Sequence, residues 1–163
     1  MNGDLALLAE SAVHILFARG ETLSSAESCT GGLIAKVITD IPGSSAAFAG
    51  ACVTYTNEVK VALLGVDPAL IDVHTEVSEE CAAAMAKGAR ERLGTTYALA
   101  TTGYAGPGGG TEKDPVGTVY LALSTPEGVR SERFSAPAGA TRDEVRCAAA
   151  ARALEMLLEC IKK

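Results

Sequence analysis

Short strand-like runs alternate with helix-periodic segments along this chain, and the alternation constrains its fold more than any other feature of the sequence. Residues 66–77 are expected to form a loop between two helices. Interleaved strands and helices with one hairpin, at 125–128, indicate a sheet that helices cover on both faces. We therefore predict that residues 1–163 form one α/β domain, a three-layer α/β/α sandwich with a mixed, mostly parallel sheet. Strands are expected near 22–26, 49–55, 97–102, 116–124 and 129–135, and helices near 4–19, 30–39, 57–64, 78–93 and 141–161.

Charge and apolar patterning exclude two classes of partner. The net charge of −6 argues against broad nucleic-acid binding, which needs a basic surface. The longest apolar runs, such as 47–53, are much shorter than a membrane span. The first residues include Asp4 and Glu10 and lack the basic start of a signal peptide. A cytoplasmic protein with no nucleic-acid or membrane partner is therefore expected.

The cysteines and histidines do not form a metal-binding or disulfide pattern. No C-x-x-C pair occurs, and the two histidines, His14 and His74, are isolated. This spacing argues against a zinc site and against a disulfide framework, and no metal or other cofactor is expected. The five cysteines are Cys29, Cys52, Cys81, Cys147 and Cys160.

The segment Ala26-Glu27-Ser28-Cys29-Thr30-Gly31-Gly32 lies where the first expected strand gives way to a helix. A serine at such a junction can stand at a helix N-terminus, where unpaired N–H groups and the helix dipole favour negative charge. This setting suits a phosphate site or an oxyanion hole behind a nucleophile. The commonest role of a serine or threonine there is an ordinary helix cap. The segment alone leaves these readings open.

A second loop rich in glycine, residues 102–110, follows the strand expected at 97–102. Ligands of open α/β sheets collect at the carboxyl ends of strands, where both loops are expected to lie. Neither loop has the spacing of a Walker loop or of a dinucleotide-binding fingerprint. Glycine clusters are commonly plain turns, but a run this dense is entropically costly to order. A ligand role and a simple turn both remain open.

Tyr55 and Lys60 belong to a third segment, in which a strand is followed by a short helix. The strand end would place Tyr55 at the same edge of the sheet as the two loops. Lys60 falls one turn into the helix, at i+3 from Asn57, and can return toward that edge. Asn57 is expected to cap this helix, and Gly65 to end it. Most tyrosines and lysines have no chemical role, so these two matter only if they converge on Ser28.

Taken together, these segments closely resemble the C-terminal domain of the CinA (competence/damage-inducible protein A) family. The stand-alone members of the family are similar to nicotinamide-nucleotide amidohydrolases (NMN deamidases, PncC-like), and the N-terminal partner domain of longer, fused proteins is expected to be absent. Tyr104 stands where the family usually has an aliphatic residue. The matching stretches, in family order, are AESCTGG (26–32), TDIPGSS (39–45), VTYTNEVK (53–60), LLGV (63–66), VSEE (77–80), TGYAGPGGG (102–110) and PVGTVYLAL (115–123).

The resemblance implies hydrolysis of the carboxamide of nicotinamide mononucleotide (NMN) to nicotinate mononucleotide and ammonia, a step of pyridine nucleotide salvage. It places a serine nucleophile at Ser28, with Tyr55 and Lys60 as its partners. A serine hydroxyl needs a base within hydrogen-bond reach, and Lys60 can serve only if its pKa is lowered. Cys29 is a rival nucleophile, because a thiolate at a helix start is intrinsically more reactive.

The resemblance also implies a small-molecule nucleotide as the ligand. Backbone N–H groups near Thr30 and Gly31 would hold the oxyanion, and the loop at 102–110 would bind the phosphate. A cationic clamp would come from Arg142 or Arg146, with Ser45 and Thr30 as further hydroxyl donors. The expected substrate-binding residues are Thr30, Gly31, Gly32, Ser45, Thr102, Gly103, Gly106, Gly108, Gly109 and Arg142.

Two other functions remain open at this point. One is a non-catalytic nucleotide- or phosphate-binding module in which Ser28 only caps a helix. The other is a homo-oligomeric scaffold whose alanine-rich helices, 78–93 and 141–161, pack between subunits. A homo-oligomer is compatible with catalysis and is expected in either case.

Overall fold

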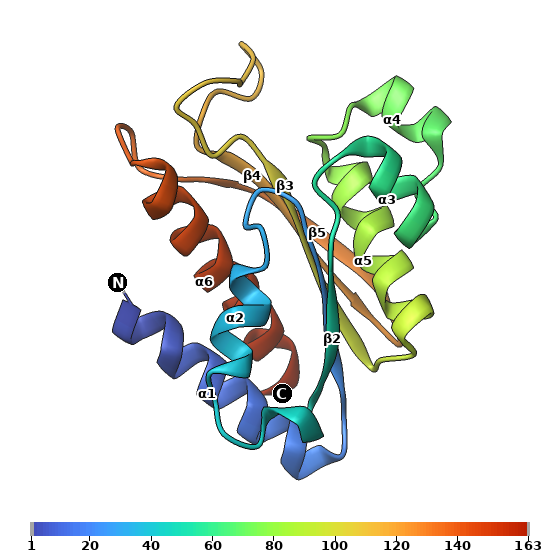
Figure 1. The fold of residues 1–163 in the computed structure, drawn as a ribbon, viewed down its shortest axis with the longest axis vertical. Helices are drawn as coiled ribbons and strands as arrows, with labels where there is room; N and C mark the ends of the chain where they lie inside the picture. The colour runs from blue at the N-terminus through green and yellow to red at the C-terminus, as the bar shows by residue number, and fades with distance from the viewer. Residues whose placement is uncertain (1, 163) are drawn as a thin grey trace.

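A five-stranded mixed sheet lies between two layers of helices in the computed structural model, which describes residues 2–162 (Figure 1). The strand order is β2-β1-β3-β4-β5. The first three of these strands are parallel, and β4 and β5 add an antiparallel hairpin to β3. This architecture confirms the predicted three-layer α/β fold. The strands are β1 (Leu23–Glu27), β2 (Phe48–Val53), β3 (Tyr97–Gly103), β4 (Thr118–Thr125) and β5 (Gly128–Ser135).

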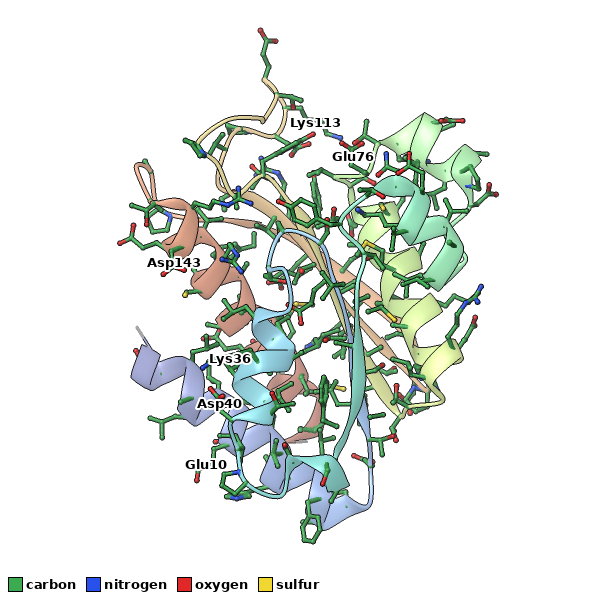
Figure 2. All side chains as sticks on the ribbon, in the orientation of Figure 1. Glu10, Lys36, Asp40, Glu76, Lys113 and Asp143 are labelled. Carbon is green, nitrogen blue, oxygen red and sulfur yellow. The ribbon has the colours of Figure 1, made fainter. Side chains whose placement is uncertain are left out.

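Helices cover both faces of the sheet (Figure 1). Both gaps are filled by side chains (Figure 2), and burial of this apolar surface stabilises the fold. The core on one face includes Leu16, Leu121 and Leu157, and the core on the other includes Met85 and Ala100. One face is covered by α1 (Asn2–Arg19), α2 (Leu33–Thr39) and α6 (Arg142–Ile161), and the other by α3 (Asn57–Leu64), α4 (Pro68–His74) and α5 (Glu79–Leu93).

Side-chain caps fix where several helices begin. The hydroxyl of Thr56 accepts a hydrogen bond from the Val59 amide, so the cap of α3 lies one residue before the predicted Asn57. Gly65 ends α3 as predicted, in a left-handed conformation. Thr141 and Glu144 form a reciprocal capping box at the start of α6.

The prediction of a loop at 66–77 is wrong, because this stretch contains α4. Asp67 caps the helix through the Ala69 amide, and Pro68 occupies its first position. The helix has seven residues, too few for a clear apolar periodicity in the sequence. The segment after α4 passes through Thr75, whose φ of 72° is rare for a residue with a side chain.

The parallel strands bring three loops to one edge of the sheet. Glu27, at the end of β1, pairs with Val53 of β2 and with Thr101 of β3. The chain that follows each strand therefore emerges at the same edge. The loops that meet there are 28–32, 54–56 and 104–117.

Within residues 2–162, no helix is both long enough and apolar enough to cross a bilayer.

Candidate active site

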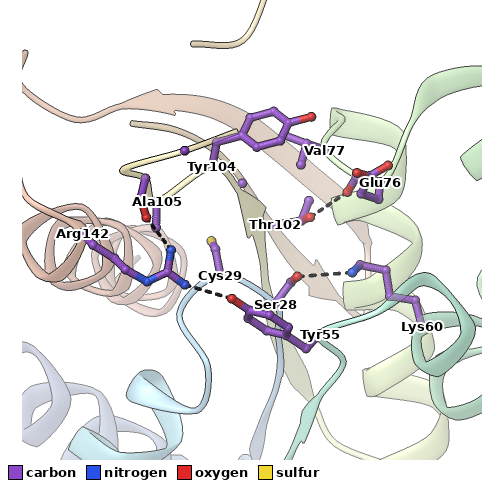
Figure 3. Close-up of a pocket in the computed structure, with 13 residues that line it drawn as sticks. Ser28, Cys29, Tyr55, Lys60, Glu76, Val77, Thr102, Tyr104, Ala105 and Arg142 are labelled. Carbon is purple, nitrogen blue, oxygen red and sulfur yellow. Dashed lines mark hydrogen bonds between the residues drawn. The ribbon is translucent and has the colours of Figure 1, made fainter. Parts of the chain in front are cut away.

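A cavity of about 220 Å³ opens at the carboxyl edge of the parallel strands (Figure 3). Its wall is built by the turn after β1, the start of α3, the link between α4 and α5, the loop after β3 and the N-terminus of α6. Its charged groups are Lys60, Glu76 and Arg142. The complete lining is Ser28, Cys29, Tyr55, Lys60, Glu76, Val77, Thr102, Gly103, Tyr104, Ala105, Gly106, Gly108 and Arg142.

Ser28 and Lys60 meet inside this cavity. The amide of Ser28 donates to the Thr101 carbonyl at 2.9 Å, which ties the turn to β3. Lys60 is 1% exposed, and its Nζ donates to Ser28 Oγ at 3.2 Å and to the Thr54 carbonyl at 3.0 Å. Figure 3 shows the two side chains pointing toward each other, Ser28 from the turn after β1 and Lys60 from α3. This is the distance that a serine nucleophile and its base require.

Burial determines how Lys60 can act. Removal from water disfavours the charged ammonium and lowers the pKa of Lys60 below its ordinary value, while Cys81 and Glu76 oppose the shift. A lysine whose pKa is lowered toward neutrality holds a larger fraction of free amine, the form that accepts a proton. The site thus contains a serine hydroxyl in contact with a buried lysine, a candidate nucleophile beside a candidate general base.

The Tyr55 hydroxyl points toward Arg142 and away from Lys60 (Figure 3). Its side chain is 59% exposed, and its hydroxyl accepts a hydrogen bond of 2.9 Å from Arg142 Nη2. Arg142 Nη1 donates to the Gly106 carbonyl at 2.6 Å. Among residues 2–162, Tyr55 forms no hydrogen bond with Ser28 or Lys60. The hydrogen bonds therefore join Tyr55 to Arg142, which also contacts the glycine-rich loop, and not to the Ser28–Lys60 pair.

Cys29 lines the cavity but is poorly suited to act as the nucleophile. The side chain is 6% exposed, and burial raises the pKa of its thiol to about 11. The thiol is therefore almost entirely protonated near neutral pH, whereas the reactive species is the thiolate. This favours Ser28, with its neighbouring amine, over Cys29.

Comparison with known protein families gives a match over residues 5–161, to the model described as the CinA C-terminal domain. The chain belongs to the CinA C-terminal domain family. Among curated relatives, a CinA-like protein from Myxococcus xanthus is 57% identical over 140 residues, which cover 85% of this chain and 32% of that protein. The relative named nicotinamide-nucleotide amidohydrolase PncC, from Shewanella oneidensis, is 51% identical over 154 residues, or 94% of this chain and 36% of that protein.

The chain therefore spans about a third of the length of these curated relatives. Solved structures of the CinA superfamily match over nearly their whole length. The competence/damage-inducible protein CihA of Agrobacterium tumefaciens has a TM-score of 0.93 and 40% identity, covering 98% of this chain and 96% of that one. A CinA superfamily protein of Escherichia coli has a TM-score of 0.92 and 30% identity, covering 98% and 92%.

This CinA domain brings most of the predicted site residues together. The Thr102 hydroxyl donates a hydrogen bond of 2.6 Å to the Glu76 carbonyl. It therefore holds the segment after α4 against the cavity. The predicted residues on the cavity wall are Ser28, Tyr55, Lys60, Thr102, Gly103, Gly106, Gly108 and Arg142.

Ser45 is not brought to the site. It is exposed in a short 3-10 helix, Ser44–Ala46, which precedes β2. Because Phe48 at the start of β2 pairs with Leu23 at the start of β1, this helix lies at the opposite edge of the sheet. Gly109 is exposed and does not line the cavity either.

Three other residues that were predicted to bind substrate do not line the cavity and instead form the turn after Ser28: Thr30, Gly31 and Gly32. The Thr30 hydroxyl is buried and lies 2.7 Å from Glu27 Oε2 and 2.8 Å from Thr101 Oγ1. Gly31 and Gly32 have φ values of 60° and 91°, a region that residues with a side chain rarely adopt. These two glycines therefore permit the tight turn itself.

Glu27 and Glu76 are site residues that the sequence did not reveal. Glu27 is fully buried at the end of β1, where its carboxylate accepts hydrogen bonds from the start of α2. The chain around Glu76 was predicted to be a loop, and no spacing rule connects that segment with Ser28.

Within the described residues, no group of three or more His, Cys, Asp or Glu side chains could hold a metal ion.

Proposed function

We propose that this chain hydrolyses the carboxamide of nicotinamide mononucleotide, giving nicotinate mononucleotide and ammonia, with Ser28 as nucleophile and Lys60 as general base. The observation that carries the proposal is the buried Lys60 Nζ, 3.2 Å from Ser28 Oγ at the cavity wall. The relative named nicotinamide-nucleotide amidohydrolase supports the choice of substrate. A serine activated by a lysine is an established alternative to the serine–histidine pair.

In the proposed reaction, the neutral amine of Lys60 takes the proton of Ser28 as Oγ attacks the carboxamide carbon. The resulting ammonium then protonates the departing nitrogen, so that ammonia leaves and an acyl-enzyme remains on Ser28. Water attacks the acyl-enzyme with Lys60 again as the base, and the carboxylic acid product is released.

The oxyanion needs donors close to Ser28. The amide of Gly31 is already used, because it donates to the Ser28 carbonyl at 3.1 Å. Cys29 lines the cavity, and within the described residues its amide donates no hydrogen bond to another residue, so we assign it as the oxyanion donor.

Arg142 is the cation proposed to bind the nucleotide phosphate. It lines the cavity beside Gly106 and Gly108 and is held there by its bonds to the Gly106 carbonyl and the Tyr55 hydroxyl. A guanidinium has five N–H donors, so these two bonds leave others for a phosphate. Arg146 donates to the Thr30 carbonyl at 2.8 Å and supports the turn instead.

Ammonia release from NMN tests this function directly. The purified protein is expected to produce ammonia and nicotinate mononucleotide in equal amounts, measured by an ammonia assay and by chromatography. Nicotinamide riboside, which lacks only the phosphate, is the matched control and is expected to react much more slowly. An NMN-dependent rise in melting temperature with no ammonia would contradict the proposal and favour the non-catalytic binding module.

Cys29→Ala is expected to retain the rate of wild-type ammonia release within about threefold, because the thiol is protonated and Ser28 supplies the nucleophile. A loss of stability of about 1–2 kcal/mol is expected from the space left in the core. Steady-state kinetics and urea unfolding measure the two effects. Abolished turnover in a folded Cys29→Ala protein would show that Cys29 forms the covalent bond.

A further inference from the structure

Glu27 is a buried carboxylate for which the proposed reaction has no direct use. Its side chain is 0% exposed at the end of β1, immediately before Ser28. Five groups donate hydrogen bonds to it at 2.7–3.1 Å. A buried carboxylate is costly unless its oxygens are fully satisfied, and here they are. The donors are Ser25 Oγ and the Ala35 amide to Oε1, and Thr30 Oγ1 and the amides of Gly32 and Ile34 to Oε2.

The free backbone amides at the N-terminus of α2 are occupied by hydrogen bonds to Glu27. The amides of Gly32, Ile34 and Ala35 point at the carboxylate, and the amide of Leu33 donates to the Thr30 carbonyl. A helix N-terminus ordinarily favours an external anion. In this chain the anion is internal, so the N-terminus of α2 holds the turn and is not directed at a ligand.

The same bonds define the path of residues 28–32. The Glu27 carboxylate holds the turn through hydrogen bonds from the Thr30 hydroxyl and the Gly32 amide. The backbone carbonyl of Glu27 accepts a hydrogen bond from the Thr54 amide. The Thr54 carbonyl in turn accepts from Lys60 Nζ. Glu27 is therefore the chain neighbour of Ser28 and is connected through Thr54 to Lys60, the other member of the pair.

We propose that Glu27 is a positioning residue, whose carboxylate occupies the N-terminus of α2 and holds the turn 28–32 in the shape that keeps Ser28 Oγ against Lys60 Nζ. This inference rests on the proposed function for its kinetic test. A displacement of about 1 Å at a nucleophile can cost about 100-fold in rate without a comparable loss of binding. Glu27 thus acts on catalysis through Ser28 and does not touch substrate.

Glu27→Gln is the first test, because glutamine keeps the shape but presents an NH₂ group to N–H donors. We expect kcat for NMN, corrected for the folded fraction, to fall about 100-fold while KM changes less than about threefold. The matched control is Ser24→Ala, on the same strand, whose buried hydroxyl contacts Thr95 Oγ1 at 2.8 Å and not the turn. A kcat within threefold of wild type, or an equal fall in Ser24→Ala, overturns the proposal.

Thr30→Val is the second test, and it applies even if Glu27→Gln does not fold. Valine keeps the volume but removes the hydroxyl that donates to Glu27. A positioning role predicts a lower kcat with KM unchanged. If Thr30 binds substrate directly, as its sequence position suggests, KM rises instead and the proposed role of this contact is overturned.

The thiol of Cys29 reports on the same geometry without any turnover. The charges that act on this thiol are Glu27, which raises its pKa, and Lys60, which lowers it. In Glu27→Gln, the midpoint of Cys29 alkylation by iodoacetamide, followed by mass spectrometry, is expected to shift to lower pH, with no shift in Ser24→Ala. An unchanged midpoint overturns the placement of Glu27, whereas failure of wild-type ammonia release counts against the proposed function alone.

Discussion

Ser28→Ala is expected to release ammonia from NMN about 10⁴-fold more slowly than the wild-type protein, because it removes the only atom proposed to bond to the carboxamide carbon. NMN binding is expected to be largely retained, since the proposed phosphate contacts come from Arg142 and the glycine-rich loop. Single-turnover ammonia assays measure the rate, and calorimetry on the inactive variant measures binding.

Ser44→Ala is the matched control for this variant. Ser28 and Ser44 are each 8% exposed, but Ser44 lies in the short helix at the opposite edge of the sheet. The control is expected to keep the wild-type rate. Residual activity above about a tenth of wild type in folded Ser28→Ala would be too high for a nucleophile and would contradict the assignment.

Lys60→Met is expected to lower the rate of ammonia release about 10³-fold or more, because no other base contacts Ser28 Oγ in the described structure. Wild-type kcat/KM is expected to rise with pH as Lys60 loses its proton and to level off below pH 10.5, the ordinary lysine pKa, since burial lowers the pKa of Lys60. Methionine is unbranched and of similar length, so the cavity wall stays filled. Lys36→Met, on the exposed face of α2 beside Asp40 (Figure 2), is the control.

The same substitution has a pH-dependent effect on stability. The pKa of Lys60 is lower in the folded chain than in the unfolded chain, so between these two values the unfolded state binds more protons. The free energy of unfolding of wild type, relative to that of Lys60→Met, should therefore rise with pH through this window and become constant above 10.5. Urea unfolding at several pH values measures the difference. Parallel pH profiles for the two proteins would show that Lys60 is not desolvated.

The fold was predictable because its elements carry independent local signals. The expected α3 was bounded by Gly65, and the strand–loop–helix order fixed the three layers. The helix α4 was missed because seven residues give almost no periodicity, while a residue pair such as Asp67-Pro68 also begins turns.

The site was only partly predictable because burial of polar groups is a tertiary property. Lys60 could be placed on the correct helix turn, but its contact with Ser28 depends on how α3 packs beside β1. In the sequence Glu27 is only a charged residue at a strand end, and the amides of Gly32, Ile34 and Ala35 reach it only when the start of α2 folds back on it. The prediction that Ser45 binds substrate was wrong, because closeness in sequence to a strand does not say at which edge of the sheet a residue lies.

The antiparallel return of β4 has a practical consequence for handling the protein. β4 leaves the cavity edge at Thr118, pairing there with β3 through Val119 and Gly103, and runs eight residues before the turn to β5. At about 3.3 Å per residue this is roughly 26 Å. The exposed turn at Pro126 and Glu127 is thus an attachment point for a fluorophore or a solid support, facing away from the entrance that a nucleotide would use.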